Sequence, residues 1–168
     1  DGFGIGDTLT TDPTILYREI PRFTPEAFAF LHNPNTAKFK QFRQGLDQLL
    51  QEGVIQVLNV RHSGSKVPLL AAVGPLQFEV VQFRLENEYG ATSRLEPAPW
   101  TVVRWLPVSL NDDQLDALAL PTGAKLAHDL GNNPVILFPN DWSANYFAQS
   151  NAAIPLSSLP LGLAEAAV

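Results

Sequence analysis

The 168-residue chain contains no cysteine and no methionine. Without cysteine, disulfide bonds and thiolate metal sites are excluded, which fits the cytoplasm, where we place the protein. No apolar run approaches the roughly 20 residues that a membrane-spanning helix needs, so we expect no membrane partner. A natural reading frame starts with Met, whereas this chain opens at Asp1. We therefore expect a piece of a longer protein, whose other part could carry the chemistry.

Basic residues are few and unevenly placed. The chain has 11 Lys and Arg residues and 17 Asp and Glu residues, which gives a formal net charge of −6. This charge argues against a free-standing nucleic-acid binder. All the basic residues except Lys125 precede residue 109. A basic face can therefore persist in the first part of the chain. Hydrophobic residues make up 45% of the sequence, which predicts a packed core.

The apolar pattern of residues 21–106 predicts an α+β domain with the element order β-α-β-β-α-β. Strands are expected at residues 27–31, 54–61, 69–73 and 91–96, with Ser63, Gly64 and Ser65 as a hairpin loop. The first helix begins near Asn35 or Thr36 and ends at Gly53, and the second begins near Pro75 and ends at Gly90. This order is typical of the ferredoxin-like split β-α-β plait. In that fold both helices lie on one face, strands one and three are central, and strands two and four are edges.

Each expected helix has an apolar stripe. In the first helix it comprises Phe39, Phe42, Leu46, Leu49 and Leu50. In the second helix two adjacent rows comprise Leu76, Val80 and Phe83, and Val81, Leu85 and Tyr89. Such stripes pack on a sheet. Arg84 and Glu88 stand four residues apart, which favours an ion pair.

The rest of the chain predicts an α/β extension. We expect a strand at 100–106, a short helix at 112–120 capped by Ser109 or Asn111, a strand at 135–138 and a helix at 141–149. Residues 107–150 should pack on the plait domain. Residues 151–168 have poor periodicity, and we expect a loose tail there.

Several segments resemble one family. PRFTPEAF from residue 21, KFKQFRQGLDQLLQEGVIQVL from residue 38 and AAVGPLQFEVVQFRLENEYGAT from residue 71 resemble the C-terminal domain of the bacterial peptide chain release factor 3 family. The last segment also resembles the third domain of elongation factor G, but GPLQFEVV favours the release factor. IGDTL at residues 5–9 resembles the last strand of the β-barrel that precedes this domain in translational GTPases. Residues 1–20 are therefore expected to be the end of that barrel domain and a linker. The resemblance is good over residues 1–106, weaker over 107–150 and absent after that.

The resemblance implies a factor that binds GTP and Mg²⁺ through an absent N-terminal domain and removes class-I release factors from the ribosome after peptide release. It also implies that this domain touches small-subunit rRNA and protein and moves relative to its own GTPase and β-barrel domains. One alternative is a domain of an elongation-factor-G-like or ribosome-protection GTPase. Another is a stand-alone ferredoxin-like ligand-binding module, for which Gly74-Pro75 is only a weak ligand loop.

The motifs give no catalytic, cofactor or metal site, so we expect no enzyme activity from this piece. The run from Gly2 to Gly6 lacks the third glycine of a dinucleotide fingerprint, because residue 7 is Asp. Gly64-Ser65-Lys66 lacks the frame of a P-loop. The three histidines, His32, His62 and His128, have no partner at ligand spacing. Likewise Asp112, Asp113 and Asp116 lack the glycine and glutamate of an EF-hand, and suit the first turns of a helix.

Two sets of cations are candidates for ribosome contact. The first set flanks the hairpin loop and comprises Arg61, His62 and Lys66. The second lies off the apolar stripe of the first helix and comprises Lys38, Lys40 and Arg43. Ordinary solvated charge is the alternative for both sets, and the hairpin is favoured because exposed loops present cations freely. Glu79, near the start of the second helix, is a candidate interdomain contact, with dipole stabilisation or an ion pair as the alternative.

Overall fold

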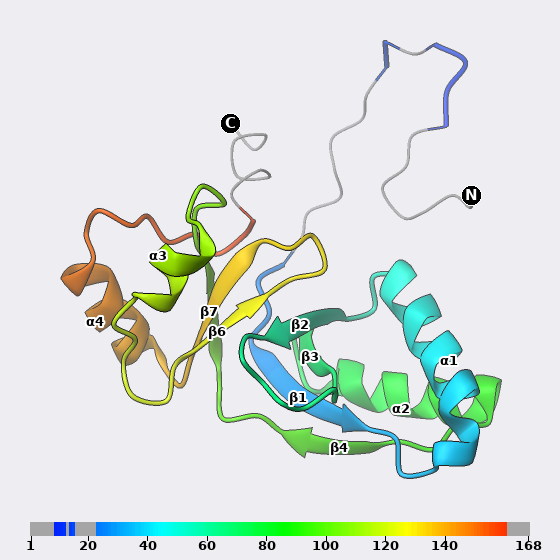
Figure 1. Ribbon diagram of the computed structural model, residues 1–168. Helices are drawn as coiled ribbons and strands as arrows, with labels where there is room; N and C mark the ends of the chain where they lie inside the picture. Colours follow the sequence, from blue (N-terminus) through cyan, green and yellow to red (C-terminus); the bar gives the residue numbers. More distant parts are fainter. Residues whose placement is uncertain (1–8, 13, 16–22, 161–168) are drawn as a thin grey trace.

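The computed structural model describes residues 9–12, 14–15 and 23–160. Over these residues the chain is an α+β structure with one curled antiparallel sheet and four α-helices (Figure 1). The elements in order are β1 (Ala27–His32), the 3-10 helix η1 (Thr36–Lys38), α1 (Phe39–Gln51), β2 (Gln56–Val60), β3 (Leu69–Ala72), α2 (Leu76–Tyr89), β4 (Arg94–Pro97), β5 (Val102–Trp105), α3 (Asp112–Asp116), β6 (Lys125–His128), β7 (Pro134–Phe138) and α4 (Asp141–Ser150). The predicted barrel strand, apart from Leu9, and most of the predicted linker lie outside the described residues.

The strand order is β4-β1-β3-β2-β6-β7-β5, and every pairing is antiparallel. Strands β2 and β3 form the predicted hairpin, in which Leu58 pairs with Leu69. Helices α1 and α2 both cover one face of β1 to β4 (Figure 1). Side chains alternate along β1: Ala29 and Leu31 face these helices, whereas Phe28 faces the opposite side, as the pleat of a strand requires.

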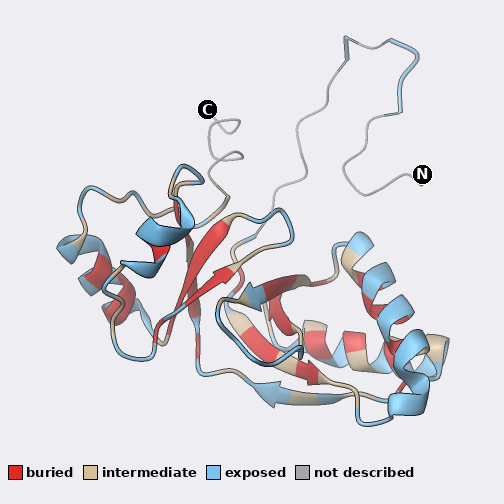
Figure 2. Cartoon of the chain, viewed as in Figure 1, coloured by how far each residue is buried: buried red, intermediate tan, exposed pale blue. Residues whose placement is uncertain are grey.

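Three cores follow from this arrangement, and Figure 2 shows them as buried strands and inward helix faces. The first lies between the sheet and the helices α1 and α2. The second lies where the curled sheet brings the other face of β1 and β3 against β5, β6 and β7, with Trp100 and Trp105 between them. The third lies between the outer side of β5 to β7 and the helices α3 and α4, with Phe138 and Phe147 in contact at 5.8 Å between ring centroids.

The helix ends agree with the predicted caps. Asn35 caps η1, with its side chain accepting a hydrogen bond from the backbone of Ala37 at 3.1 Å. Asn111 caps α3 through a reciprocal pair of bonds with Gln114. Gly53 and Gly90 follow the ends of α1 and α2 with φ of 69° and 62°, a left-handed conformation that glycine adopts without steric cost.

Helices α1 and α2 pack closely against each other at Gly45. A Cβ atom at this position would stand 2.7 Å from Leu85 Cδ2 and 2.7 Å from Tyr89 Cδ2. Only a residue without a side chain therefore allows the observed approach of the two helices.

Strand β2 differs from the prediction because it is not an edge. Its last residues, Asn59 and Val60, pair with His128 and Ala127 of β6. Strand β6 was not expected from the sequence, since its four residues, Lys-Leu-Ala-His, carry no clear alternation of polar and apolar positions. As a result, the sheet is continuous from the first half of the chain into the second. Strand β5, which ends before residue 107, pairs with β7 inside the expected extension.

Some expected core positions are exposed. Phe39, at the junction of η1 with α1, is 57% exposed. The row of Leu76, Val80 and Phe83 is also exposed, whereas Val81 and Leu85 are buried. The predicted stripe of α1 otherwise holds, with Phe42, Leu46 and Leu49 buried.

Helix α3 differs from the prediction in length, and the C-terminal tail differs from it in packing. Helix α3 ends at Asp116, four residues earlier than predicted. The described part of the predicted loose tail is anchored: Ser157 and Trp105 exchange backbone hydrogen bonds of 2.8 and 3.1 Å. Ile154 and Leu156 pack on the third core. These contacts, which periodicity does not reveal, correct the prediction for residues 154–157, while residues 161–168 lie outside the described part.

Candidate docking surfaces

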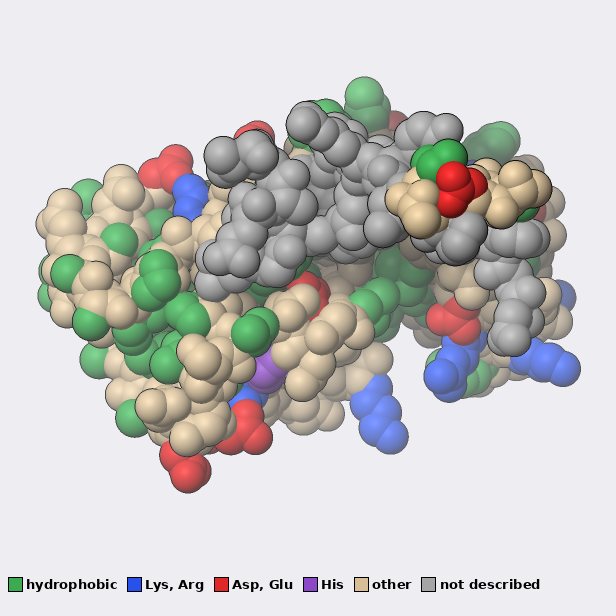
Figure 3. Space-filling view, turned by 90° about the horizontal axis from the view of Figure 1, so that it is seen from above, with side chains coloured by type: hydrophobic (Ala, Val, Ile, Leu, Met, Phe, Trp, Pro, Cys, Tyr) green, Lys and Arg blue, Asp and Glu red, His purple; other side chains and the backbone are tan. Residues whose placement is uncertain are grey.

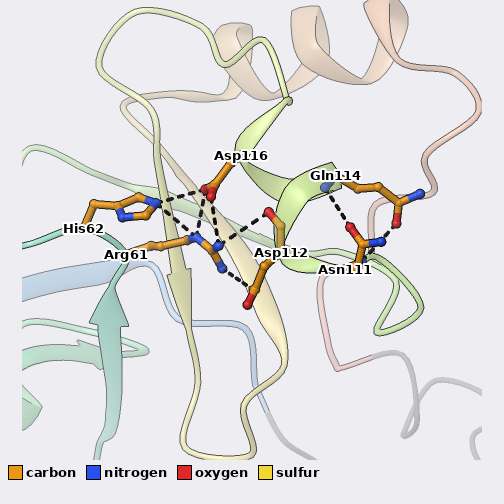
Figure 4. A network of polar contacts seen from close by, with 6 residues as sticks. All are labelled: Arg61, His62, Asn111, Asp112, Gln114 and Asp116. Carbon is orange, nitrogen blue, oxygen red and sulfur yellow. Dashed lines mark hydrogen bonds and ion pairs between the residues drawn. The ribbon is translucent and has the colours of Figure 1, made fainter.

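Arg61 directly follows β2, and its side chain is only 13% exposed. It lies against α3 of the second half (Figure 4). Its Nη1 donates to Asp112 Oδ1 at 2.6 Å, and its Nε donates to Asp116 Oδ1 at 2.9 Å. A further bond from Nη2 to Asp116 Oδ2 measures 3.1 Å, so the guanidinium binds this carboxylate at both oxygens.

The electrostatics of this cluster are those of a satisfied ion-pair network. Hydrogen bonds from Arg61, and next from His62, hold the pKa of Asp116 below its ordinary value. The same carboxylates raise the pKa of Arg61. Because two carboxylates neutralise one guanidinium, Arg61 could reach a phosphate only by leaving both of them. The geometry therefore makes Arg61 the link between β2 and α3.

The two other residues of the loop set remain on the surface. His62 has a φ of 55° and a side chain that is 72% exposed, with Nε2 lying 2.9 Å from Asp116 Oδ1. Lys66 is exposed, and no residue of the described part forms an ion pair with it. Of the cations near this loop, Arg61 is thus held by internal ion pairs, whereas Lys66 is accessible to a partner.

The set on the first helix is exposed throughout. Lys38 lies in η1, and Lys40 and Arg43 lie on the outer side of α1. Arg43 stands 4.0 Å from Asp47, too far for a hydrogen bond. Between residues 23 and 160, no hydrogen bond or ion pair connects these residues to the loop set. In the view of Figure 3, Lys and Arg side chains lie at separate places and do not form one continuous basic field.

Glu79 lies in the first turn of α2 and is exposed. No ion pair or hydrogen bond of its side chain occurs among the described residues, so its interdomain contact stays a prediction. The ion pairs across the two helices involve Arg84 instead. Arg84 binds Glu52 at the end of α1 and also Glu88, whose Oε1 is 2.7 Å from its Nε. These bonds from Arg84 hold the pKa of Glu52 and of Glu88 below the ordinary value.

Sequence reasoning missed the acids that clamp Arg61. It placed Asp112 and Asp116 at a helix start for the helix dipole, and no local signal connects them to a residue about fifty positions earlier. Within the described ranges, no three His, Asp or Glu side chains gather in a way that could hold a metal ion. None of the helices there is long and apolar enough to cross a membrane.

Comparison with known proteins gives one consistent family. Residues 17–148 match the family described as class II release factor RF3, C-terminal domain. The chain is 43% identical over 157 residues to peptide chain release factor 3 of Cyanothece sp., covering 94% of this chain and 29% of that protein. The proteins of the same name from Synechococcus elongatus and Rippkaea orientalis are 43% and 42% identical, with 94% and 95% of this chain covered and 28% and 30% of theirs.

The chain thus spans less than a third of the length of these relatives. The match extends through α3, β6, β7 and most of α4, where the sequence segments quoted above gave only a weaker resemblance. It covers well over half of the chain and includes the elements that carry both sets of candidate cations. The chain belongs to the peptide chain release factor 3 family, and the part of that family it represents is the C-terminal domain.

Proposed function

We propose that this chain is the ribosome-docking domain of a GTP-dependent termination factor that promotes dissociation of class-I release factors after peptide release. The observation that carries the proposal is the family match over residues 17–148. The relatives are named peptide chain release factors, and termination is the step in which such a factor acts. The place of action is then the cytoplasm, where ribosomes translate.

We assign residues 21–106 to a ferredoxin-like plait. The neighbouring strands β4-β1-β3-β2 and the two helices on one face support this assignment. The remaining elements form an extension that shares the sheet. Such a body suits a mechanical role, because one continuous sheet with three cores resists internal bending.

The segment around Lys66 does not fit a GTP- and Mg²⁺-binding P-loop. Around Lys66, Val60 and Ser65 occupy the two positions where a P-loop has glycine, and Val67 occupies its Ser/Thr position. This segment is also a loop between two strands, not the start of a helix. We therefore place the nucleotide site elsewhere in the longer protein and give this domain no catalytic step. Nucleotide state would act on it by changing its orientation relative to the GTPase and β-barrel domains.

The docking contacts are assigned to the exposed cations. Lys38 and Lys40 on one side, and Lys66 in the loop, can approach rRNA phosphates or acidic protein groups without breaking an internal ion pair in the described part, and Arg43 would give up only its 4.0 Å pair with Asp47. We leave Arg61 out of the proposed contact surface because Asp112 and Asp116 already hold its guanidinium. A charge reversal at Arg61 would damage the fold and could not report on docking.

The experiment uses the longer protein that contains this domain. The double variant Lys38→Glu/Lys40→Glu is compared with Lys125→Glu, an exposed reversal on β6 outside the assigned surface. Binding to 70S ribosomes and the rate of class-I factor release are measured for each. We expect the double variant to lose at least about tenfold in ribosome affinity, equivalent to about 1.4 kcal/mol, and Lys125→Glu to behave as the wild type.

The possible outcomes test the assigned contact surface and the proposed function separately. Unchanged affinity of the double variant would contradict the assigned surface. Failure of the wild-type protein to accelerate class-I factor release would refute the proposed function itself. The alternative of a ligand-binding module has less support, because a hollow of about 530 Å³ in the described part lies on the outer side of a single helix, between Phe39 and Gln51 of α1, whereas ligand pockets are clefts or cavities that bury most of a ligand.

A further inference from the structure

Helix α2 is apolar on two opposite faces. Its inner face packs in the first core through Phe78, Val81 and Leu85. Its outer face carries Leu76, Val80 and Phe83, which are 70%, 47% and 66% exposed. The spacing i, i+4, i+7 aligns these three side chains along the helix, and we name them the outer stripe. The core needs only the inner face, so the fold does not explain the outer stripe.

Helix α1 provides a comparison within the same molecule. It lies in the same layer, on the same face of the sheet (Figure 1). Beyond its first residue, Phe39, its exposed positions are polar or charged: Lys40, Arg43, Gln44, Asp47, Gln48 and Gln51. The layer therefore tolerates a polar exterior. A contiguous apolar stripe on the neighbouring helix is the kind of surface that marks a binding site.

The borders of the outer stripe are acidic. Glu79 and Glu86 follow one border, both exposed and without an ion pair among the described residues. On the other border, Arg84 is already shared by Glu52 and Glu88. The border with Glu79 and Glu86 is therefore negatively charged. On the other border the two carboxylates of Glu52 and Glu88 outweigh the single positive charge of Arg84. Nucleic acid would be repelled, and a second copy of α2 would bring like charges together.

We propose that the outer stripe binds an amphipathic helix of a protein partner, whose apolar side chains are bordered by Lys or Arg. Leu76 to Phe83 spans about 10 Å along the helix axis at ~1.5 Å per residue, which suits helix-on-helix packing of rows four and three residues apart. Basic side chains beside the partner's apolar row meet Glu79 and Glu86. This surface lies on a different helix from the cations assigned to ribosome docking, and the inference does not depend on that assignment.

The probe is a fluorescein-labelled synthetic helical peptide with Leu at i, i+4 and i+7 and Lys at the flanking positions. A matched peptide carries Glu in place of every Lys. The complete 168-residue chain is titrated into each, and fluorescence anisotropy is recorded. We expect the Lys peptide to bind at least about tenfold more tightly than the Glu peptide, with its affinity falling as salt screens the acidic borders.

Variants of the chain then locate the binding. The double variant Leu76→Gln/Phe83→Gln removes apolar surface from the outer stripe, and Phe39→Gln makes the matched change at the exposed start of α1. We expect the double variant to weaken Lys-peptide binding about tenfold or more, and Phe39→Gln to leave it unchanged. In a third variant, Glu79→Gln/Glu86→Gln, the affinity for the Lys peptide should approach that for the Glu peptide. Circular dichroism checks that each variant keeps its helices.

Four results would overturn the proposal. They are equal binding of the Lys peptide to the wild type and to Leu76→Gln/Phe83→Gln, equal binding of the two peptides, binding of neither, and binding of a labelled single-stranded RNA oligonucleotide to the wild type that Leu76→Gln/Phe83→Gln abolishes. Sedimentation velocity tests the remaining occupant: a wild-type dimer that Phe83→Gln dissociates would assign the outer stripe to a second copy of the chain instead.

Discussion

Replacing Gly45 with alanine sets two effects of opposite sign against each other. In an exposed helix the change would stabilise the fold by roughly 1 kcal/mol, because alanine has the higher helix propensity. In this structure the new Cβ would meet Leu85 Cδ2 and Tyr89 Cδ2, each at 2.7 Å, and Tyr89 Cγ at 2.8 Å. Overpacking of this kind costs about 1–3 kcal/mol. We therefore expect Gly45→Ala to lower the free energy of unfolding by about 0–2 kcal/mol.

The assay is urea unfolding followed by the fluorescence of the buried tryptophans Trp100 and Trp105, with the m-value checked for constancy. Gln44→Ala, at the exposed neighbouring position, is the control and should change stability by less than about 0.5 kcal/mol. A double-mutant cycle with Tyr89→Ala isolates the contact. When Tyr89 is truncated, Gly45→Ala should lose most of its penalty, giving a coupling of about 1–3 kcal/mol.

One result would refute the reasoning. If Gly45→Ala were about 1 kcal/mol more stable than the wild type, and the cycle showed no coupling, then helices α1 and α2 would not approach as closely as described. A stabilised variant with clear coupling would instead mean that Tyr89 turns aside at little cost.

Three further changes test other parts of the fold. The folded pKa of Asp116 lies below its ordinary 3.8, so its stabilising contribution is complete above that value and is lost as pH falls through the folded pKa. Asp116→Asn should therefore remove part of the decline in the urea midpoint between about pH 6 and pH 3. Asn140→Ala, which removes the side-chain cap of α4, should cost about 1 kcal/mol in urea unfolding, whereas Asn140→Ser should cost far less. Trp105→Phe removes the 3.0 Å bond from Nε1 to Asp129 and should lower the unfolding free energy by about 1 kcal/mol or more, with a lower melting temperature as the readout.

Local patterns predicted most of the first half of the fold. Phe42, Leu46 and Leu49 recur at helical spacing and are all buried. The glycines that end the two helices could be read from the sequence, because a left-handed residue after a helix is a local requirement. An N-cap is likewise a local requirement, and Asn111, one of the two predicted caps, is the one that caps α3.

Long-range pairing explains what the sequence did not predict. Strand β6 is held by β2 and β7 and has little strand character of its own. The partner of Arg61 is chosen by how the second half folds back, so a surface cation and a buried clamp look alike in sequence. The two apolar rows of α2 have similar spacing. Only the position of the sheet decides that Val81 is buried and Phe83 is exposed.

Strand β2 belongs to both halves of the molecule. Its first residues, from Gln56 to Leu58, pair with β3, and Asn59 and Val60 pair with β6. Load applied to the extension therefore reaches the helix-covered half along an unbroken backbone, reinforced by the Arg61 clamp at the end of that strand. A force on α4, which contacts β7, would therefore pass through β6 to β2 and from there to the strands that α1 and α2 cover.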